Sequence, residues 1–285
     1  MQNELSLPKT PIRFALYASR PYWYWGMFAV MCVVLAGSID SATYYVFKRL
    51  IDTSMAYSNG TVAISAVLIW VVAYPLTATG HQFLYRAANY FAATWLTSTR
   101  SHGANMLFRY LSLHSIPYFN NRFAGSTASK IWNASGGVQG MYETFLWGYL
   151  STFIAFVTSA FLVYTVSYWV GHLFIGWIAA LVVANYFLSK RTAKYSEQRA
   201  AIRSRVSGVV VDIVTNMLAV KNFARRAAEI ERVEAGTEEL RVASWWSWFY
   251  YETLLVFNNV LNTLFALSMI GAGYFLWSSG QITIG

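Results

Sequence analysis

Five long apolar segments, joined by connectors of very unequal length, set the pattern of the sequence. A helix needs about 20 mainly apolar residues to cross the hydrocarbon layer of a membrane. The pattern predicts membrane-spanning helices at residues 22–47, 62–84, 145–166, 169–188 and 249–277. The fourth is the shortest, since Lys190 and Arg191 end its apolar run, and a tight turn at 167–171 lets Trp169 and Val170 lengthen it.

The connectors between these segments fall into two classes. Residues 48–61 and 167–172 are short, whereas residues 85–144 and 189–248 are long, amphipathic and basic. Because consecutive spans alternate in direction, both long connectors lie on the same side of the membrane. We expect them to contact a partner on that side.

The composition agrees with a membrane protein. Hydrophobic residues make up 56% of the 285 residues and charged residues only 12%, whereas soluble domains carry about 25% charged residues. This composition excludes a water-soluble fold of this size. We predict an all-α polytopic membrane protein with five long transmembrane helices, which extend into the cytosol as two helical hairpins.

The basic residues are distributed unevenly. Of the 21 Lys and Arg residues, nineteen precede the first span or lie in the two long connectors, and only Lys48 and Arg49 lie in a short one. Positive charge accumulates on the cytoplasmic side of membrane proteins. We therefore expect a cytosolic N-terminus in an inner (plasma) membrane, and topology rather than a nucleic-acid partner accounts for the net charge of +9.

The first long connector has the pattern of a helical hairpin. Residues 61–114 contain one proline, Pro75, and a continuous helix over them would be on the order of 80 Å long, against a hydrocarbon layer of about 30 Å. The helix should end near His114, after which Pro117 and Gly125 are expected to bracket one short helix. Residues 126–143 then lead back to the third span.

The second long connector repeats this plan. Its apolar residues recur every three or four positions, as on one face of a helix. Packing against neighbouring helices explains most of them. The stripe consists of Ile202, Val206, Val209, Ile213, Met217, Val220 and Phe223, and Ala227, Ile230 and Val233 continue it.

Two such hairpins resemble the intracellular loops of type I ATP-binding cassette (ABC) exporters. Residues 115–126, SIPYFNNRFAGS, resemble the first coupling helix of that family, and residues 211–224, VDIVTNMLAVKNFA, resemble the second. The sequence PIRF at 11–14 is similar to the interfacial elbow before the first span, and residues 280–285 are similar to the outer turn that follows the fifth.

The resemblance implies a division into two regions and a set of contact residues. Residues 1–21 would form a cytosolic N-terminus with an elbow helix, and residues 22–285 a transmembrane domain that is incomplete at its C-terminus. The hairpins would dock on nucleotide-binding domains. The residues implied are Pro117, Tyr118, Phe119, Asn120 and Asn121 in the first loop, with Asp212, Thr215, Asn216 and Met217 in the second; alternatively, Tyr118 and Phe119 only hold their own hairpin together.

The source of energy would lie outside these residues. The sequence has no Gly-x-x-x-x-Gly-Lys-Ser/Thr phosphate loop, and its one cysteine, Cys32, excludes an intrachain disulfide. We expect no catalytic residue, cofactor or metal here, and ATP with Mg²⁺ in the nucleotide-binding domain. Five spans from a cytosolic N-terminus would put Gly285 outside, so we expect the front part of an exporter half that pairs with a second half.

Few polar residues lie in the predicted spans. Asp40, with Tyr44 and Trp147, could line a pathway for a small-molecule or lipid substrate, because an intramembrane carboxylate is often functional. Alternatively, Asp40 is hydrated at the outer interface or paired with Lys48 two turns away, and the aromatic residues only pack. An ATPase-independent carrier or a non-transporting regulatory partner is the alternative function, although carriers need broken helices and polar sites at mid-bilayer.

Overall fold

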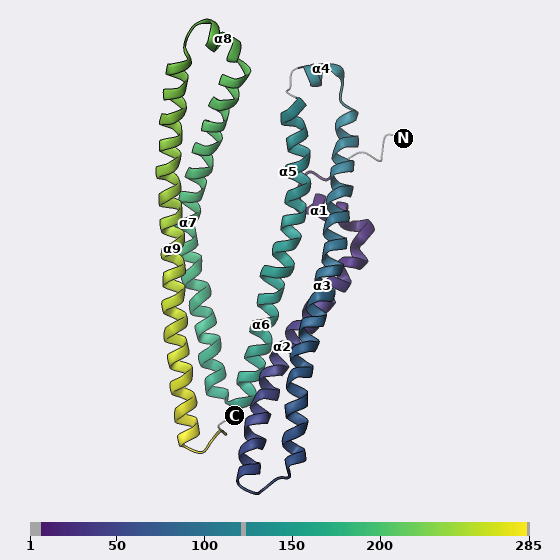
Figure 1. Ribbon diagram of the computed structural model, residues 1–285, viewed down its shortest axis with the longest axis vertical. Coiled ribbons are helices and arrows are strands. Elements are labelled where there is room, and N and C mark those ends of the chain that lie inside the picture. The colour runs from purple at the N-terminus through teal and green to yellow at the C-terminus, as the bar shows by residue number, and fades with distance from the viewer. Residues whose placement is uncertain (1–6, 121–123, 284–285) are drawn as a thin grey trace. The chain divides into compact units, whose positions relative to one another are not determined.

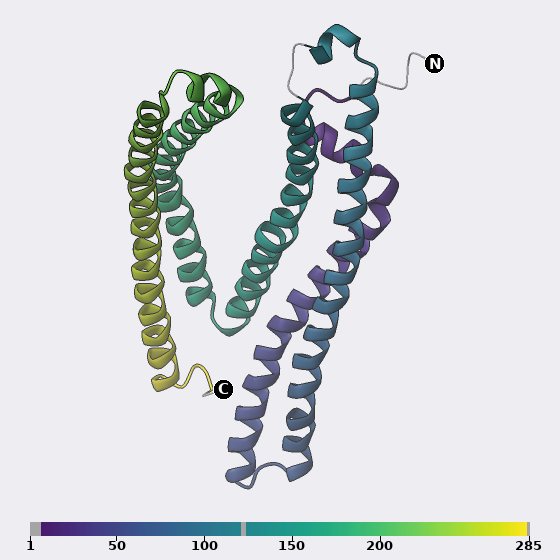
Figure 2. The same ribbon diagram turned by 45° about the horizontal axis from the view of Figure 1, so that its top comes forward.

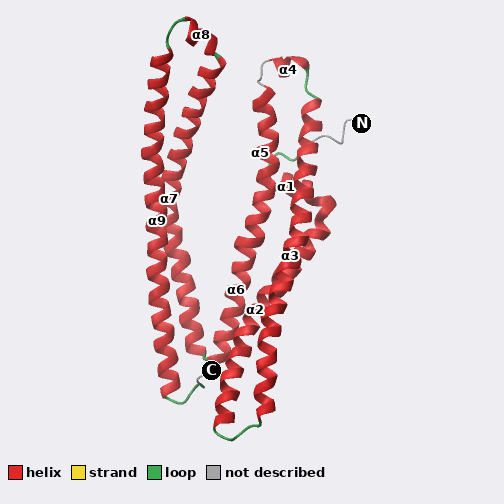
Figure 3. Ribbon diagram, in the orientation of Figure 1, coloured by secondary structure: helices red, strands yellow, loops and turns green. Residues whose placement is uncertain are grey.

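The computed structural model describes residues 7–120 and 124–283. Every regular element among them is a helix, which confirms the predicted all-α class (Figure 3). The helices fall into two compact units. The first contains the chain up to Val166 together with the residues from Thr283, and the second contains Ser167–Ile282.

The first unit is built on two long helices that run side by side, α2 and α3 (Figures 1 and 2). Helix α3 has 49 residues and passes through Pro75 without a break, so the long continuous helix predicted there is confirmed. The elements of this unit are α1 (Pro11–Ser19), η1 (Arg20–Tyr22), α2 (Trp23–Ser58), α3 (Ile64–Ser112), α4 (Ile116–Asn120), α5 (Ala124–Glu143), η2 (Thr144–Leu150) and α6 (Ser151–Val166).

Small residues let these helices approach closely, as is usual between helices in membranes. A Cβ atom on Gly26 of α2 would lie 2.7 Å from the Trp95 ring of α3. One on Gly37 would lie 2.8 Å from Ile154 of α6. The main core forms where α1, α2, α3, α5 and η2 meet, and contains Phe14, Ala15, Ala29, Ala92, Trp95, Leu96, Val138, Tyr142 and Leu146.

Helix α1 forms where the elbow was expected. Its buried face packs on α3, and a Cβ atom on Gly103 would lie 3.7 Å from Ala18. Ser19, at the end of α1, accepts a hydrogen bond of 2.8 Å from Trp95 Nε1. The helix is therefore part of the core of the first unit, and its place at a membrane interface stays a prediction.

The second unit is one helical hairpin, in which α7 (Tyr168–Thr215) and α9 (Arg226–Ser278) lie side by side and α8 (Met217–Asn222) closes the end (Figures 1 and 2). Aromatic side chains stack between the long helices: the Tyr195 and Tyr250 ring centroids are 4.1 Å apart. Beyond its apolar part, α9 carries Glu238, whose pKa is lowered by hydrogen bonds from the Arg241 guanidinium.

Among the described residues, five helical segments are long and apolar enough to cross a membrane, namely Pro11–Ser58, Ile64–Ser112, Thr127–Val166, Tyr168–Thr215 and Arg226–Ser278. Each overlaps one predicted span and is longer than it, although the second predicted span, 62–84, begins two residues before α3. The predicted connector at 48–61 is wrong for most of its length, since α2 continues to Ser58. Pairing of Lys48 with Asp52 one turn away supports helical structure beyond the apolar run.

Candidate functional site

The first hairpin ends in a tight bend, which we call the first tip (residues 113–120). Helix α3 stops at Ser112, and the Leu113 and His114 N–H groups donate to carbonyl groups three residues back. Helix α4 begins at Ile116. Pro117 falls in its first turn, where a missing N–H group costs nothing. The short helix predicted after His114 is therefore present.

Aromatic rings run along the first tip. The ring centroids of Tyr110 and His114 are 5.1 Å apart, those of His114 and Tyr118 are 4.2 Å apart, and Phe119 meets Tyr118 edge-on at 5.4 Å. Tyr118 is half-buried against its own hairpin, whereas Phe119 is 41% and Ile116 77% exposed. Tyr118 thus holds the tip together, and Phe119 and Ile116 present an apolar surface.

The other residues expected at this tip are Gly125 and the two asparagines, Asn120 and Asn121. Gly125 does not follow the end of the short helix, since it lies in the first turn of α5. That prediction was wrong because glycine is also tolerated in a first turn, where its N–H group has no intrahelical partner. Asn120 is the last residue of α4, and Asn121 lies outside the described residues.

The second hairpin ends in what we call the second tip (residues 212–225). The resemblance implied one coupling helix within residues 211–224, but the structure has two helices there, since α7 ends at Thr215 and α8 begins at Met217. Asn216 between them has φ −101° and ψ 21°. Its Nδ2 donates to the carbonyl oxygen and to Oδ1 of Asp212, both at 3.0 Å. Side-chain bonds of this kind compete with helix continuation.

A groove of about 540 Å³ lies beside the second tip, between α7, α8 and the start of α9. Ile213, Met217 and Val233 are among its apolar lining residues, and charged side chains form the rest of the lining. Leu218 and Phe223 are 75% and 77% exposed. Of the predicted residues, Asp212 and Thr215 occupy the last turn of α7, and Met217 reaches the groove.

A family model for the ABC transporter transmembrane region matches residues 27–285. The chain belongs to this family. An uncharacterized ABC transporter ATP-binding protein of Haemophilus influenzae is 23% identical over 171 residues, which make up 60% of this chain. The matched part spans 28% of the length of that relative.

Membership of the ABC transporter transmembrane family confirms the resemblance seen in the sequence. The chain is a multi-pass membrane protein and a membrane component of an ABC transporter. The two tips are the ends of its two extended hairpins. Among the described residues, no group of three or more His, Cys, Asp or Glu side chains could hold a metal ion.

The three residues suggested for a substrate pathway lie at two levels of the first unit. Trp147 is half-buried, packs against the cluster around Cys32, and lies 5.2 Å from the Tyr85 ring. Asp40 and Tyr44 are exposed. Eight residues separate Cys32 from Asp40, a rise of about 12 Å along a helix. Trp147 packs within the first unit, and a pathway role for Asp40, Tyr44 and Trp147 stays a prediction.

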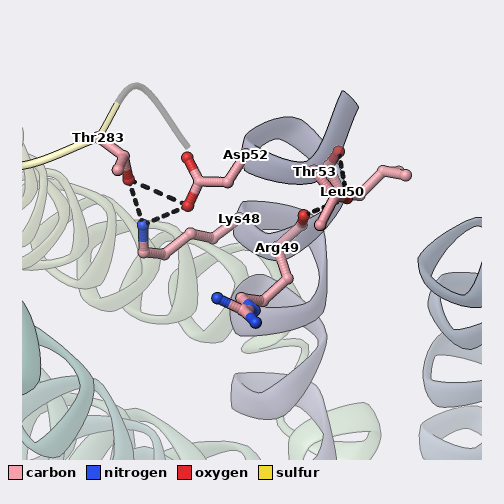
Figure 4. A network of polar contacts seen from close by, with 6 residues as sticks. All are labelled: Lys48, Arg49, Leu50, Asp52, Thr53 and Thr283. Atoms are coloured by element: carbon pink, nitrogen blue, oxygen red, sulfur yellow. Dashed lines mark hydrogen bonds and ion pairs between the residues drawn. The ribbon is translucent and has the colours of Figure 1, made fainter. Parts of the chain in front are cut away.

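The suggested pair between Asp40 and Lys48 is wrong. Lys48 Nζ lies 2.8 Å from Asp52 Oδ2 and donates to Thr283 Oγ1 at 2.7 Å, and Thr283 also donates to Asp52 at 3.0 Å (Figure 4). A spacing of four residues brings two side chains together on a helix, whereas a spacing of eight separates them by about 12 Å. Asp40 has no side-chain hydrogen bond or ion pair to any described residue.

Two polar residues, one in a predicted span and one just before the next, have structural partners. His81 Nδ1 lies 3.0 Å from the carbonyl oxygen of Ala36 on the neighbouring helix, so His81 is a packed polar residue. Glu143 Oε1 accepts a hydrogen bond of 2.7 Å from Gln139, which in turn accepts one from Arg100.

Sequence reasoning missed the most exposed apolar residues of the tips, Ile116, Leu218 and Phe223. Each was assigned to a motif or a packing stripe but not to a contact surface. The signal that could have identified them is position, since each lies within three residues of a helix end. A stripe that continues past a helix break no longer faces the neighbouring helix.

Proposed function

We propose that this chain forms the membrane part of an ATP-driven exporter half and that a nucleotide-binding domain docks on both tips. The main observation in support is that each extended hairpin ends in a short helix with exposed apolar side chains in or next to it. These are Ile116 and Phe119 at the first tip and Leu218 and Phe223 at the second.

Docking has a physical rationale. The tips lie at the far ends of hairpins that extend beyond the apolar segments, so their apolar side chains face water. Burying apolar surface contributes about 25 cal/mol per Å², and a short amphipathic helix fits a groove on a partner. Residues 117–121 and 212–217 are the contact segments we propose. The helices behind the tips are long and continuous, which suits transmission of movement toward the membrane.

ATP and Mg²⁺ would bind to the partner domain. The residues described here offer no phosphate loop, and the Haemophilus influenzae relative, named an ATP-binding protein, is several times longer than the matched part. A second membrane half would complete the transport pathway, since one half provides only one wall. We propose a small molecule or a lipid as substrate, with exposed Asp40 and Tyr44 lining the pathway.

We further propose that the tips and the N-terminus are cytosolic and that the membrane is a bacterial inner membrane. Nineteen of the 21 cationic residues lie before the first span or in the extended hairpins, as expected for cytoplasmic segments. Residues 1–21 would then form the cytosolic elbow region and residues 22–285 the membrane domain. The same orientation is required for contact with a domain that binds cytosolic ATP.

The experiment is a measurement of ATP hydrolysis by the assembled transporter in lipid nanodiscs. Phe119→Asp and Leu218→Asp each place a charge in one of the two contacts. We expect each variant to lower the ATPase rate about tenfold, because an interface residue that contributes about 1.4 kcal/mol changes binding by that factor. The matched controls are Phe108→Asp and Val242→Asp, at exposed apolar positions on α3 and α9 away from the tips. Equal rates in all four variants would contradict docking through the tips, and absence of ATPase activity in the wild-type assembly would favour an ATPase-independent membrane protein.

A further inference from the structure

A second pocket in the α7–α9 hairpin lies just beyond the apolar parts of both helices. Its volume is about 280 Å³. The fourth predicted span ends at Leu188 and the fifth begins at Phe249, so the pocket opens at the level where the hydrocarbon layer gives way to headgroups. Its lining residues are Thr192, Ser196 and Arg199 of α7 with Ser247, Trp248 and Tyr251 of α9.

The polar lining of this pocket consists of one guanidinium and three aliphatic hydroxyl groups. Arg199 is half-buried, and Ser247 is only 4% exposed. Arginine offers five donors and no acceptor, and hydroxyl groups can rotate to donate. The Thr192 hydroxyl now donates to the Leu188 carbonyl oxygen over a long 3.3 Å and would turn from it toward a phosphate. None of the six lining residues carries a carboxylate. Such a set suits a phosphate group, which arginine binds through paired charge-assisted hydrogen bonds.

The depth of the pocket suits a lipid headgroup. Thr192 lies four residues past Leu188, a rise of about 6 Å, and the headgroup layer is about 5–8 Å thick on each side. Arg199 lies eleven residues past Leu188, a rise of about 16 Å, but side chains on a helix lean toward its N-terminus. On α7 that direction is toward the membrane, and a long arginine side chain can extend to the interface.

The remaining wall of the pocket is aromatic. Trp248 and Tyr251 meet edge-on with ring centroids 6.1 Å apart, and both are exposed. Tryptophan and tyrosine prefer the boundary between hydrocarbon and water. A phosphate held by Arg199 would have these rings beside it, where the glycerol and the start of the acyl chains of a phospholipid would lie.

The charge around the pocket is positive. Residues 190–199 of α7 contain Lys190, Arg191, Lys194 and Arg199 against one carboxylate, Glu197, and the facing turn of α9 adds Glu252. Clusters of cationic residues next to a span attract anionic lipids. The excess of two positive charges therefore favours an anionic phospholipid over a zwitterionic one.

We propose that this pocket is a binding site for the phosphate group of an anionic phospholipid. Arg199 and the hydroxyl groups of Thr192, Ser196 and Ser247 hold the phosphate, and Trp248 and Tyr251 contact the glycerol region. The site goes beyond the proposed transport function, because it lies outside the suggested pathway and requires no nucleotide-binding domain.

Photocrosslinking in nanodiscs tests the site. The whole chain is placed in equal parts of phosphatidylglycerol and phosphatidylcholine with a trace of photoreactive phosphatidylglycerol, and crosslinked peptides are mapped by mass spectrometry. We expect crosslinks at residues 247–251 that additional phosphatidylglycerol reduces and additional phosphatidylcholine does not. If inorganic phosphate reduced the crosslink as strongly as phosphatidylglycerol does, the ligand would be a soluble phosphate compound, and a lipid ligand would be contradicted.

Two matched variants distinguish a specific phosphate site from general electrostatic attraction of anionic lipids to the basic segment. Arg199→Gln should reduce the crosslink at 247–251 about tenfold, as expected for loss of a charge-assisted hydrogen bond. Arg203→Gln removes the same charge one turn further on, at an exposed position outside the pocket, and should leave the crosslink unchanged. Equal loss in both variants would overturn the proposal. Thr192→Val, which removes only a hydroxyl group, gives an independent test should Arg199→Gln alter the helical circular dichroism.

Discussion

At the scale of single residues, Trp95 of α3 connects this helix to three others of the first unit. Its Nε1 donates to Ser19 Oγ at 2.8 Å, its ring centroid lies 4.4 Å from that of Tyr142, and a Cβ atom on Gly26 would lie 2.7 Å from its ring. The ring is only 6% exposed, so its neighbours fix its position. The close approach of α2 to α3 therefore depends on the absence of a side chain at Gly26.

Gly26→Ala should destabilise the protein. The new Cβ atom would lie 2.7 Å from the Trp95 ring, and overpacking of this kind costs about 1–3 kcal/mol. We expect the midpoint of thermal unfolding in detergent to fall by several degrees. Gly80→Ala on α3 is the matched control, since a Cβ atom there meets nothing within 4 Å; an equal loss in both variants would contradict the packing explanation.

Residue roles could be predicted only where they depend on local spacing. No other His, Cys or carboxylate stands at ligand spacing from His81 in the sequence, which favours a packed polar residue, and its Nδ1 lies 3.0 Å from the Ala36 carbonyl oxygen. The partner of Lys48 was missed because Asp52 was assigned to a loop, whereas the helix that carries both continues past the apolar run. The outward orientation of Phe119 depends on how Tyr118 packs on His114, and spacing alone does not determine this.

At the scale of elements, a pair of amide side chains joins α7 to α9. Asn185 Nδ2 donates to Asn258 Oδ1 at 2.8 Å, and Asn258 Nδ2 donates to Asn185 Oδ1 at 2.9 Å. Both residues lie within predicted spans, where water cannot replace a lost partner. The reciprocal pair fixes which turn of α7 faces which turn of α9.

Asn258→Leu should cost about 1 kcal/mol of unfolding free energy, the usual contribution of a hydrogen bond between helices in a membrane. The double variant Asn185→Leu/Asn258→Leu should recover part of this loss, because no amide then remains unpaired. Chemical unfolding of the four proteins of this mutant cycle measures the coupling. Asn259→Leu, at the exposed neighbouring position, should have little effect, and strictly additive losses would contradict the pairing.

Helix existence was predictable from apolar runs and three-to-four-residue spacing, but helix ends were not. The extensions of α7 and α9 through charged segments were predicted from the spacing of apolar residues in the second long connector. The end of α2 was not, since a connector was predicted from residue 48 and the helix continues to Ser58. Backbone hydrogen bonds and pairs of side chains one turn apart maintain these extensions in water. The break at Asn216 was missed because it depends on a side-chain bond to Asp212.

At the scale of the whole molecule, each unit combines a membrane-spanning part with an extension that ends in a tip. The unequal connectors of the sequence correspond to these extensions, and the family match over residues 27–285 places the chain among ABC transporter membrane regions. The transported substrate depends on a surface that includes a second half, so neither apolar periodicity nor loop motifs could predict it.

Cysteine crosslinking from the tips to the nucleotide-binding domain tests the proposed coupling most directly. Cys32, the one cysteine of the chain, is first replaced by alanine, and single cysteines are placed at Phe119, Leu218 or, as a control, at Phe108. We predict that cysteines at 119 and 218 form crosslinks to a polypeptide that binds ATP, that ATP alters the yield, and that a cysteine at 108 forms none. Absence of crosslinks from both tips in a transporter that still hydrolyses ATP would contradict the coupling role and the cytosolic orientation of the tips.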